Sequence, residues 1–238
     1  MKKIMISLVE SYGNISGKLN HRKQYFRNKF LYKTHQRKKL EYDIMKIFLS
    51  RKQQFGGDML YQTHPKIDLR GQRPTIVRFE TYRLEKYLNK NMNVLDVGAN
   101  IGFFSLYISD YVKSVDIVEY EPRLVKIAKL AKNKLDVMNA RIFNQDIKKF
   151  NPDKKYHMIF SFAIHGWVGM PLDEYMKLLV SFLRPDGTIL IESHLTNRKK
   201  DVLEDFFAQN KDKYKIIDKG VTDDHRGNLR NFYYVKPL

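Results

Sequence analysis

From Asn91 onward, short apolar runs alternate with amphipathic segments of helical length. The strand-like runs are residues 94–97, 115–119, 140–143, 157–161, 188–192, 213–218 and 230–236. The helical patterns are residues 103–111, 123–135, 172–183 and 198–209. Strands that alternate with such helices form βαβ units, and the last two strands, being close in sequence, favour an antiparallel edge. The sequence therefore predicts an α/β fold with a doubly wound, mostly parallel seven-stranded sheet and an antiparallel edge.

The segment before this sheet is strongly basic. The chain carries 44 Lys and Arg against 26 Asp and Glu, a formal charge of +18, and much of the surplus precedes Gly56. Residues 20–53 also place apolar side chains at helical spacing, which predicts one or two basic amphipathic helices. We expect a basic helical extension or lid at residues 1–70 and the main domain at residues 71–238. The extension faces a substrate, grips RNA, or simply packs on the main domain as a helical cap.

Composition excludes several classes of protein. The chain has no cysteine, which excludes disulfides, thiolate metal sites and thiol nucleophiles. Its apolar runs are far shorter than the ~20 residues of a membrane-spanning helix. The first residues lack the long apolar stretch and cleavage site of a signal peptide. We therefore expect a soluble, cytoplasmic protein that attracts anions such as phosphorylated metabolites, nucleic acid or a membrane surface.

The turn after the first predicted strand carries the most informative pattern, Asp-x-Gly-x-Asn-x-Gly. Its members are Asp96, Gly98, Asn100 and Gly102. In doubly wound sheets, ligands bind beyond the carboxyl ends of the strands, and glycines let the backbone approach them closely. The pattern is neither the dinucleotide fingerprint nor a Walker A loop. A carboxylate before the first glycine repels a pyrophosphate, so the pattern favours a sulfonium or amino-acid ligand.

Two further acidic residues follow later strands. Glu119 closes the second strand, at the distance from the glycine turn where an acidic residue binds ribose hydroxyls. Asp146 follows the third strand, where it can accept a hydrogen bond from an adenine amino group. The alternatives are a surface charge for Glu119 and a helix cap or turn residue for Asp146.

Residues 75–238 resemble the class I S-adenosylmethionine-dependent methyltransferases. The resemblance rests on four motifs, residues 94–102, 118–122, 144–146 and 182–191. It implies S-adenosylmethionine as the cofactor and assigns cofactor contacts to Asp96, Gly98, Asn100, Gly102, Glu119, Asp146, Ile147 and Ser161. Asn100 replaces the family's more common glycine, and Asp186 replaces the first glycine of the last motif.

The acceptor side is defined by the ends of the fourth and fifth strands. The segment 161–167 lacks the Asn/Asp-Pro-Pro-aromatic motif of many amino-group methyltransferases, which weighs against base N-methylation. His165 is a candidate general base, with Glu192 and His194 in support. Their dispersed positions predict no metal site. The alternatives are structural hydrogen bonding by both histidines, or alignment of the reactants without a base.

Arginines gather just before the core of the predicted sheet, where the family's cofactor lid usually lies. Arg70, Arg73 and Arg78 are candidate substrate contacts because arginine forks suit phosphate or carboxylate, and Trp167 is a fourth. The segment also resembles bacterial methyltransferases of surface-glycan and secondary-metabolite pathways. From Thr75, a helical pattern extends to about Leu88.

The predicted reaction is methyl transfer to an oxygen, with nitrogen less favoured, of an anionic or phosphorylated small molecule or glycan intermediate. The first alternative is an RNA methyltransferase that grips its substrate with the basic N-terminal helices, although no RNA-binding module is recognisable. The others are a non-catalytic scaffold, which the intact cofactor motifs argue against, and docking of residues 20–53 on a membrane surface.

Overall fold

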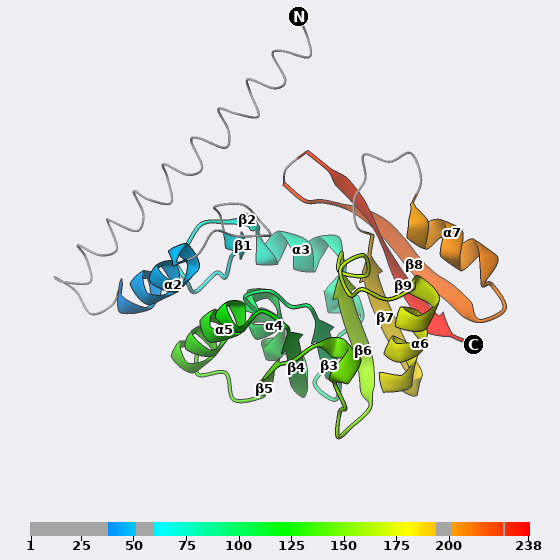
Figure 1. The fold of residues 1–238 in the computed structure, drawn as a ribbon, viewed down its shortest axis with the longest axis horizontal. Coiled ribbons are helices and arrows are strands. Elements are labelled where there is room, and N and C mark those ends of the chain that lie inside the picture. Colours follow the sequence, from blue (N-terminus) through cyan, green and yellow to red (C-terminus); the bar gives the residue numbers. More distant parts are fainter. Residues whose placement is uncertain (1–37, 51–59, 194–200, 226) are drawn as a thin grey trace, which may run out of the picture.

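The computed structural model describes residues 38–50, 60–193, 201–225 and 227–238, and a twisted seven-stranded sheet forms its centre (Figure 1). The strands are β3 (Asn93–Val97), β4 (Ser114–Glu119), β5 (Ala140–Asn144), β6 (Tyr156–Phe162), β7 (Leu183–Glu192), β8 (Tyr214–Asp223) and β9 (Leu229–Pro237). Their order is β5-β4-β3-β6-β7-β9-β8. Strands β3 to β7 run parallel, and β9 is antiparallel to both β7 and β8. The predicted fold class is confirmed.

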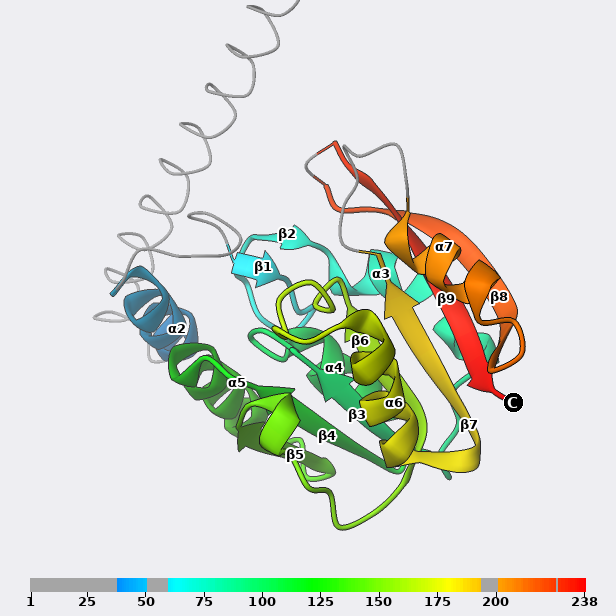
Figure 2. The ribbon, with the colours of Figure 1, turned by 45° about the vertical axis from the view of Figure 1, so that its right-hand side comes forward.

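Helices cover both faces of the sheet (Figures 1 and 2). They are α4 (Phe103–Ile108) and α5 (Pro122–Lys134) on one face, and α6 (Leu172–Phe182) and α7 (Val202–Gln209) on the other. Each buries an apolar stripe at helical spacing, such as Leu124, Ile127 and Ala131 of α5. Among the described residues, no helix is long and apolar enough to cross a membrane.

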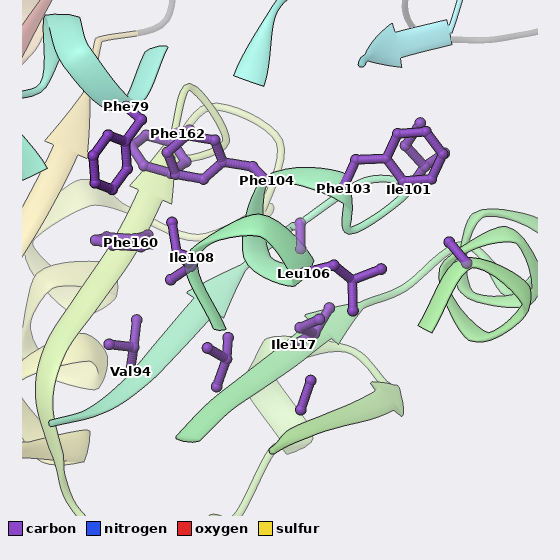
Figure 3. Close-up of a cluster of buried hydrophobic side chains, with 14 of the residues drawn as sticks. Phe79, Val94, Ile101, Phe103, Phe104, Leu106, Ile108, Ile117, Phe160 and Phe162 are labelled. Atoms are coloured by element: carbon purple, nitrogen blue, oxygen red, sulfur yellow. The ribbon is translucent and has the colours of Figure 1, made fainter. Parts of the chain in front are cut away.

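The alternation of side chains along β3 decides where its carboxylate lies. Val94 joins the core under α4 and α5, shown in Figure 3, whereas Leu95 and Val97 join the core under α6 and α7. Successive side chains of a strand point to opposite faces, so Asp96 lies on the same face as Val94. Asp96 also pairs in register with Phe160 of β6, whose ring belongs to that core. The carboxylate of Asp96 is thereby placed under the layer formed by α4 and α5.

The N-terminal part of the described chain packs on this same layer. Helix α2 (Lys39–Leu49) buries Ile44, Met45 and Phe48 and lies beside α5 in both views (Figures 1 and 2). It confirms a helix within residues 20–53, while residues 20–37 and 51–53 lie outside the described residues.

Two short strands, β1 (Leu60–Gln62) and β2 (Gly71–Arg73), form a separate parallel pair that the sequence did not predict. They pair across the expected boundary between residues 70 and 71. Strand pairing thus connects residues on the two sides of this boundary. The division into an extension and a main domain remains a prediction.

Helix α3 (Thr75–Thr81) ends seven residues before the predicted limit at Leu88. Arg83 adopts a left-handed conformation with φ 57°, which interrupts the helix, and a 3₁₀ turn follows at Leu84–Lys86. Tyr82, at the end of α3, donates a hydrogen bond to Glu192 of β7. The break thus accompanies a contact between α3 and the sheet.

Candidate functional site

The predicted cofactor residues meet where the strand order reverses. The chain adds β4 and β5 on one side of β3, and then crosses to add β6 and β7 on the other side. Strands β3 and β6 are neighbours, so their carboxyl ends bound a topological switch point, where ligands bind in open α/β sheets. The turn at residues 98–102, Glu119 and Ser161 all lie at this edge. The structure therefore brings together residues that lie far apart in the sequence.

Asp96 is a buried carboxylate with unused bonding capacity. Only 1% of the residue is exposed, and Ser105 of α4 donates a hydrogen bond to Oδ2. Oδ1 is buried and has no hydrogen-bond partner among the described residues. Burial raises the pKa of Asp96 to about 7, although the Ser105 bond opposes the shift. The ionised form of this group is suited to a cationic ligand.

The turn after β3 depends on three left-handed residues, Gly98 (φ 67°), Asn100 (φ 58°) and Gly102 (φ 69°). The Gly98 N–H donates to the Val118 carbonyl at 2.8 Å, which ties the turn to β4. Asparagine tolerates this conformation better than most residues, which explains how Asn100 replaces a glycine. A Cβ at Gly98 would lie 2.8 Å from Cγ2 of Ile164. Glycine is therefore required at position 98 for both conformation and space.

Glu119 holds the turn from the next strand. Its Oε2 accepts the Asn100 N–H at 2.8 Å, and its Oε1 accepts the Glu121 N–H at 2.9 Å. Burial raises the pKa of Glu119, while these backbone bonds act against the increase. Each carboxylate oxygen can accept more than one hydrogen bond. Both oxygens of Glu119 can therefore also accept hydrogen bonds from ribose hydroxyls.

Asp146 and Ile147 lie beside Glu119 at the end of β5. The intervening Gln145 donates its N–H to the Glu119 carbonyl at 3.1 Å. Asp146 caps the 3₁₀ turn Ile147–Lys149, because its Oδ1 accepts the Lys148 N–H at 2.9 Å. The capping alternative considered from the sequence is thus present, and the Ile147 side chain is buried. Contact of both residues with adenine remains a prediction.

The other predicted residues of this edge lie at the end of β6 and in the loop that follows it. Ser161 is buried, and its hydroxyl shares a 2.8 Å hydrogen bond with that of Tyr175. Ala163 has φ 57° and turns the chain sharply. Beyond it, His165 is half-buried and Trp167 is 57% exposed. His194 lies outside the described residues.

Glu192 is fully buried and belongs to an ionic network. Arg73 forms a fork with it, Nη1 to Oε1 at 2.8 Å and Nη2 to Oε2 at 3.1 Å, and Arg230 lies 3.3 Å from Oε1. Tyr82 donates a further hydrogen bond. Although burial acts to raise it, the pKa of Glu192 is lowered because these arginines stabilise the charge. Such a carboxylate is a weak base, and the geometry favours a positioning role.

The three predicted arginines lie in different surroundings. Arg70 is exposed, whereas Arg73 is fully buried in its pairing with Glu192. Arg78 is also buried, and its Cζ lies 4.4 Å from the ring centroid of Phe104 and 4.6 Å from that of Phe162. Of the three, Arg70 is the one exposed to solvent, and its contact with an acceptor remains a prediction.

Gln62 supports the site and was not predicted. Its Nε2 donates to the Ala99 carbonyl at 3.1 Å, and its Oε1 accepts the Phe104 N–H at 3.2 Å. It therefore braces the glycine turn and the first turn of α4. No sequence signal indicated this role, because β1, which carries Gln62, was not itself expected.

A family model described as a methyltransferase domain matches residues 69–220. The chain belongs to this methyltransferase family. The prediction of a class I methyltransferase is confirmed by the match and by the fold, so the chain is an enzyme. Solved proteins of the same fold are SAM-dependent methyltransferases in complex with S-adenosyl-L-homocysteine, which supports the predicted cofactor, S-adenosylmethionine. The open Oδ1 of Asp96 and the glycine turn fit a ligand with a cationic amino-acid end.

The chain spans only about a third of the length of the curated relatives it matches. The chain is 35% identical over 106 residues to a malonyl-[acyl-carrier protein] O-methyltransferase of Ilyobacter polytropus, covering 42% of this chain and 37% of the relative. It is 34% identical over 76 residues to an rRNA adenine N-6-methyltransferase of Limosilactobacillus reuteri, covering 31% and 30%.

Among solved structures, a SAM-dependent methyltransferase of Geobacter sulfurreducens in complex with S-adenosyl-L-homocysteine is similar in fold. Its TM-score is 0.58 at 15% identity, and the match covers 82% of this chain and 98% of that one.

Proposed function

We propose that this enzyme methylates an oxygen, with nitrogen less favoured, of an anionic or phosphorylated small molecule or glycan intermediate. The observation that carries the proposal is the arrangement at the switch point, where Glu119 holds the left-handed glycine turn and the buried Oδ1 of Asp96 has no hydrogen-bond partner among the described residues. The formal charge of +18 supports an anionic acceptor. The proposed place of action is the cytoplasm.

The cofactor residues divide by the part of the molecule that each suits. Asp96 and the turn at Gly98 and Gly102 hold the methionine part, and Glu119 accepts hydrogen bonds from the ribose hydroxyls. Asp146 and Ile147 border the adenine. When bound, S-adenosylmethionine supplies an electrophilic methyl group on a positively charged sulfur. The chain contributes orientation, which alone lowers such a barrier by several kcal/mol.

Proton removal is assigned to His165. It follows β6 at the carboxyl edge of the sheet, half-buried, and a neutral imidazole there can take the proton of an acceptor hydroxyl. Glu192 is assigned to positioning, because its carboxylate is already paired with Arg73 and Arg230. His194 remains a proposed supporting residue.

Acceptor recognition is assigned to the exposed residues at the entrance. Arg70 offers a fork for phosphate or carboxylate, and Trp167 offers an exposed aromatic face. The similarity to an enzyme named as an O-methyltransferase supports oxygen as the acceptor atom.

The acceptor class is tested by transfer of a labelled methyl group. The enzyme is incubated with methyl-labelled cofactor and either nucleotide-linked metabolites or total cellular RNA. We expect label in the metabolite fraction, with less incorporation by Arg70→Met. Label confined to RNA would reject a small-molecule acceptor.

RNA is the second candidate acceptor, favoured by the basic charge and by the similarity to an rRNA adenine N-6-methyltransferase. An enzyme of this kind would bind polynucleotides through phosphate contacts, and its affinity would fall steeply with salt. Polynucleotide binding measured across a salt series distinguishes it, since a small-molecule enzyme shows no tight binding at physiological salt.

A further inference from the structure

Arg78 presents a buried positive charge that has no hydrogen-bond acceptor within the part of the chain that the structure describes. Only 1% of the residue is exposed, and Nε, Nη1 and Nη2 all lack hydrogen-bond partners among the described residues. The guanidinium lies against Phe104 and Phe162, whose rings lie beside each other in Figure 3. Aromatic faces attract a cation, but they accept no hydrogen bonds in the plane of the guanidinium. A buried arginine in this state requires an explanation beyond packing.

The nearby carboxylates do not supply that acceptor. Glu192 feels the charge of Arg78, but its own hydrogen bonds come from Arg73, Arg230 and Tyr82. Asp96 also feels that charge, but it is bonded to Ser105 and forms no ion pair with Arg78 in the described structure. Arg78 and Oδ1 of Asp96 are therefore two open groups of opposite charge on the same face of the sheet.

A ligand that satisfies both groups must itself carry both charges. An α-amino acid does so, with an ammonium for a carboxylate and a carboxylate for a guanidinium. The amino-acid end of the cofactor is such a zwitterion. We propose that Arg78 binds the α-carboxylate of the methionine part of S-adenosylmethionine, while Asp96 binds its ammonium group. This assignment rests on the proposed cofactor site. It makes Arg78 a contact of the cofactor, whereas the sequence predicted a contact with the methyl acceptor.

Burial supports the cofactor over the acceptor as the partner of Arg78. Arg78 packs over Phe104 of α4 and Phe162 of β6, elements that border the glycine turn and the switch point. The exposed Arg70, in contrast, is accessible to an acceptor that arrives from solvent. A fully buried fork is suited to a ligand that is itself enclosed.

The test compares two ligands that differ in the amino-acid end. S-adenosylhomocysteine carries that end, whereas 5′-methylthioadenosine has the same adenosine and sulfur without it. Calorimetric affinities of both are measured for the wild type, for Arg78→Met, and for Arg184→Met, an exposed arginine at the opposite edge of the sheet. We expect Arg78→Met to weaken S-adenosylhomocysteine about 10- to 100-fold, the value of a charge-assisted hydrogen bond, and to leave 5′-methylthioadenosine unchanged. Arg184→Met should change neither.

Thermal unfolding without ligand gives a second readout. Replacing an unpaired buried charge by an apolar side chain of similar length is neutral or stabilising. The melting temperature of Arg78→Met should therefore equal or exceed that of the wild type, while its increase on adding S-adenosylhomocysteine becomes smaller. A purely structural arginine would instead lower the melting temperature when replaced.

The outcomes separate this assignment from the cofactor site itself. Equal weakening of both ligands, or unchanged affinity for S-adenosylhomocysteine, overturns the role of Arg78 and leaves the cofactor site intact. Failure of the wild type to bind either ligand overturns both.

Discussion

At the scale of single residues, Asp96 links burial to ligand binding. The two-residue period of the strand places its carboxylate on the face of β3 that α4 and α5 cover. Burial there raises the pKa of Asp96 to about 7. Because the folded-state pKa exceeds the unfolded value, the protonated group favours folding. That contribution is complete below the unfolded pKa of 3.8 and is lost as pH rises through about 7. Ionisation of Asp96, which binding of a cationic ligand requires, therefore lowers the stability of the folded state.

Binding of S-adenosylhomocysteine should accordingly depend on pH. Below pH 7, protonated Asp96 no longer attracts the ligand's ammonium group, so affinity should rise as pH increases through about 7. Calorimetry between pH 5.5 and 8 checks this, with Asp96→Asn as the matched variant. An identical pH profile in that variant would assign the dependence to another group.

Replacement of His165 tests the proposed base. If it removes the acceptor's proton, His165→Ala should lower kcat by ~10²- to 10⁴-fold while cofactor affinity stays the same. The rate is measured with the acceptor found by methyl labelling. Near-full turnover would show that alignment alone suffices and would reject the assignment.

At the scale of elements, the turn between β3 and α4 limits what the chain tolerates. Gly98 combines φ 67° with close neighbours, because a Cβ there would meet side-chain atoms of Ile164 at 2.8 and 2.9 Å, whereas a Cβ at Gly227, with φ 83°, would meet nothing within 4 Å. Gly98→Ala should destabilise the fold by roughly 1–3 kcal/mol and weaken cofactor binding. Gly227→Ala tests the cost of backbone strain alone. Urea unfolding compares the two, and equal losses would contradict the crowding by Ile164.

The ionic network joins β2 to β7 and β9, and its loss should be costly. Glu192→Gln leaves Arg73 and Arg230 buried with a weaker partner, so we expect a loss of about 3–5 kcal/mol of unfolding free energy. The exposed pair of Glu204 and Lys219 offers Glu204→Gln as a control with little effect. A large loss of kcat at unchanged stability would instead identify Glu192 as a base.

Much of this element pattern could be predicted, and the exceptions share a physical cause. Most strands of the large sheet, such as β3, β4, β6 and β7, carry apolar runs, and the glycine turn carries residue types that its conformation requires. Strands β1 and β2 span three residues each, too few for a periodic signal, and form only by pairing with each other. Likewise, Arg73 and Glu192 lie 119 residues apart, and only the sheet topology makes them partners. Residue types therefore revealed the cofactor motifs but not the internal pairing of predicted substrate and catalytic residues.

At the scale of the whole molecule, the site lies where two cores meet at one edge of the sheet. The helices α4 and α5 cover one face and α6 and α7 the other, and β3 and β6 contribute side chains to both cores. The carboxyl ends of these two strands are consequently held by packing on both sides, which fixes the turn and the loop after β6 relative to each other. The net positive charge of the chain attracts anions to the molecule as a whole.

Binding of the cofactor to this edge is tested most directly by calorimetric titration of the wild type and Asp96→Ala with S-adenosylmethionine. We expect saturable binding at one site in the wild type and a marked loss of affinity in the variant. Absence of binding to the wild type, or equal affinity in the variant, would contradict the account.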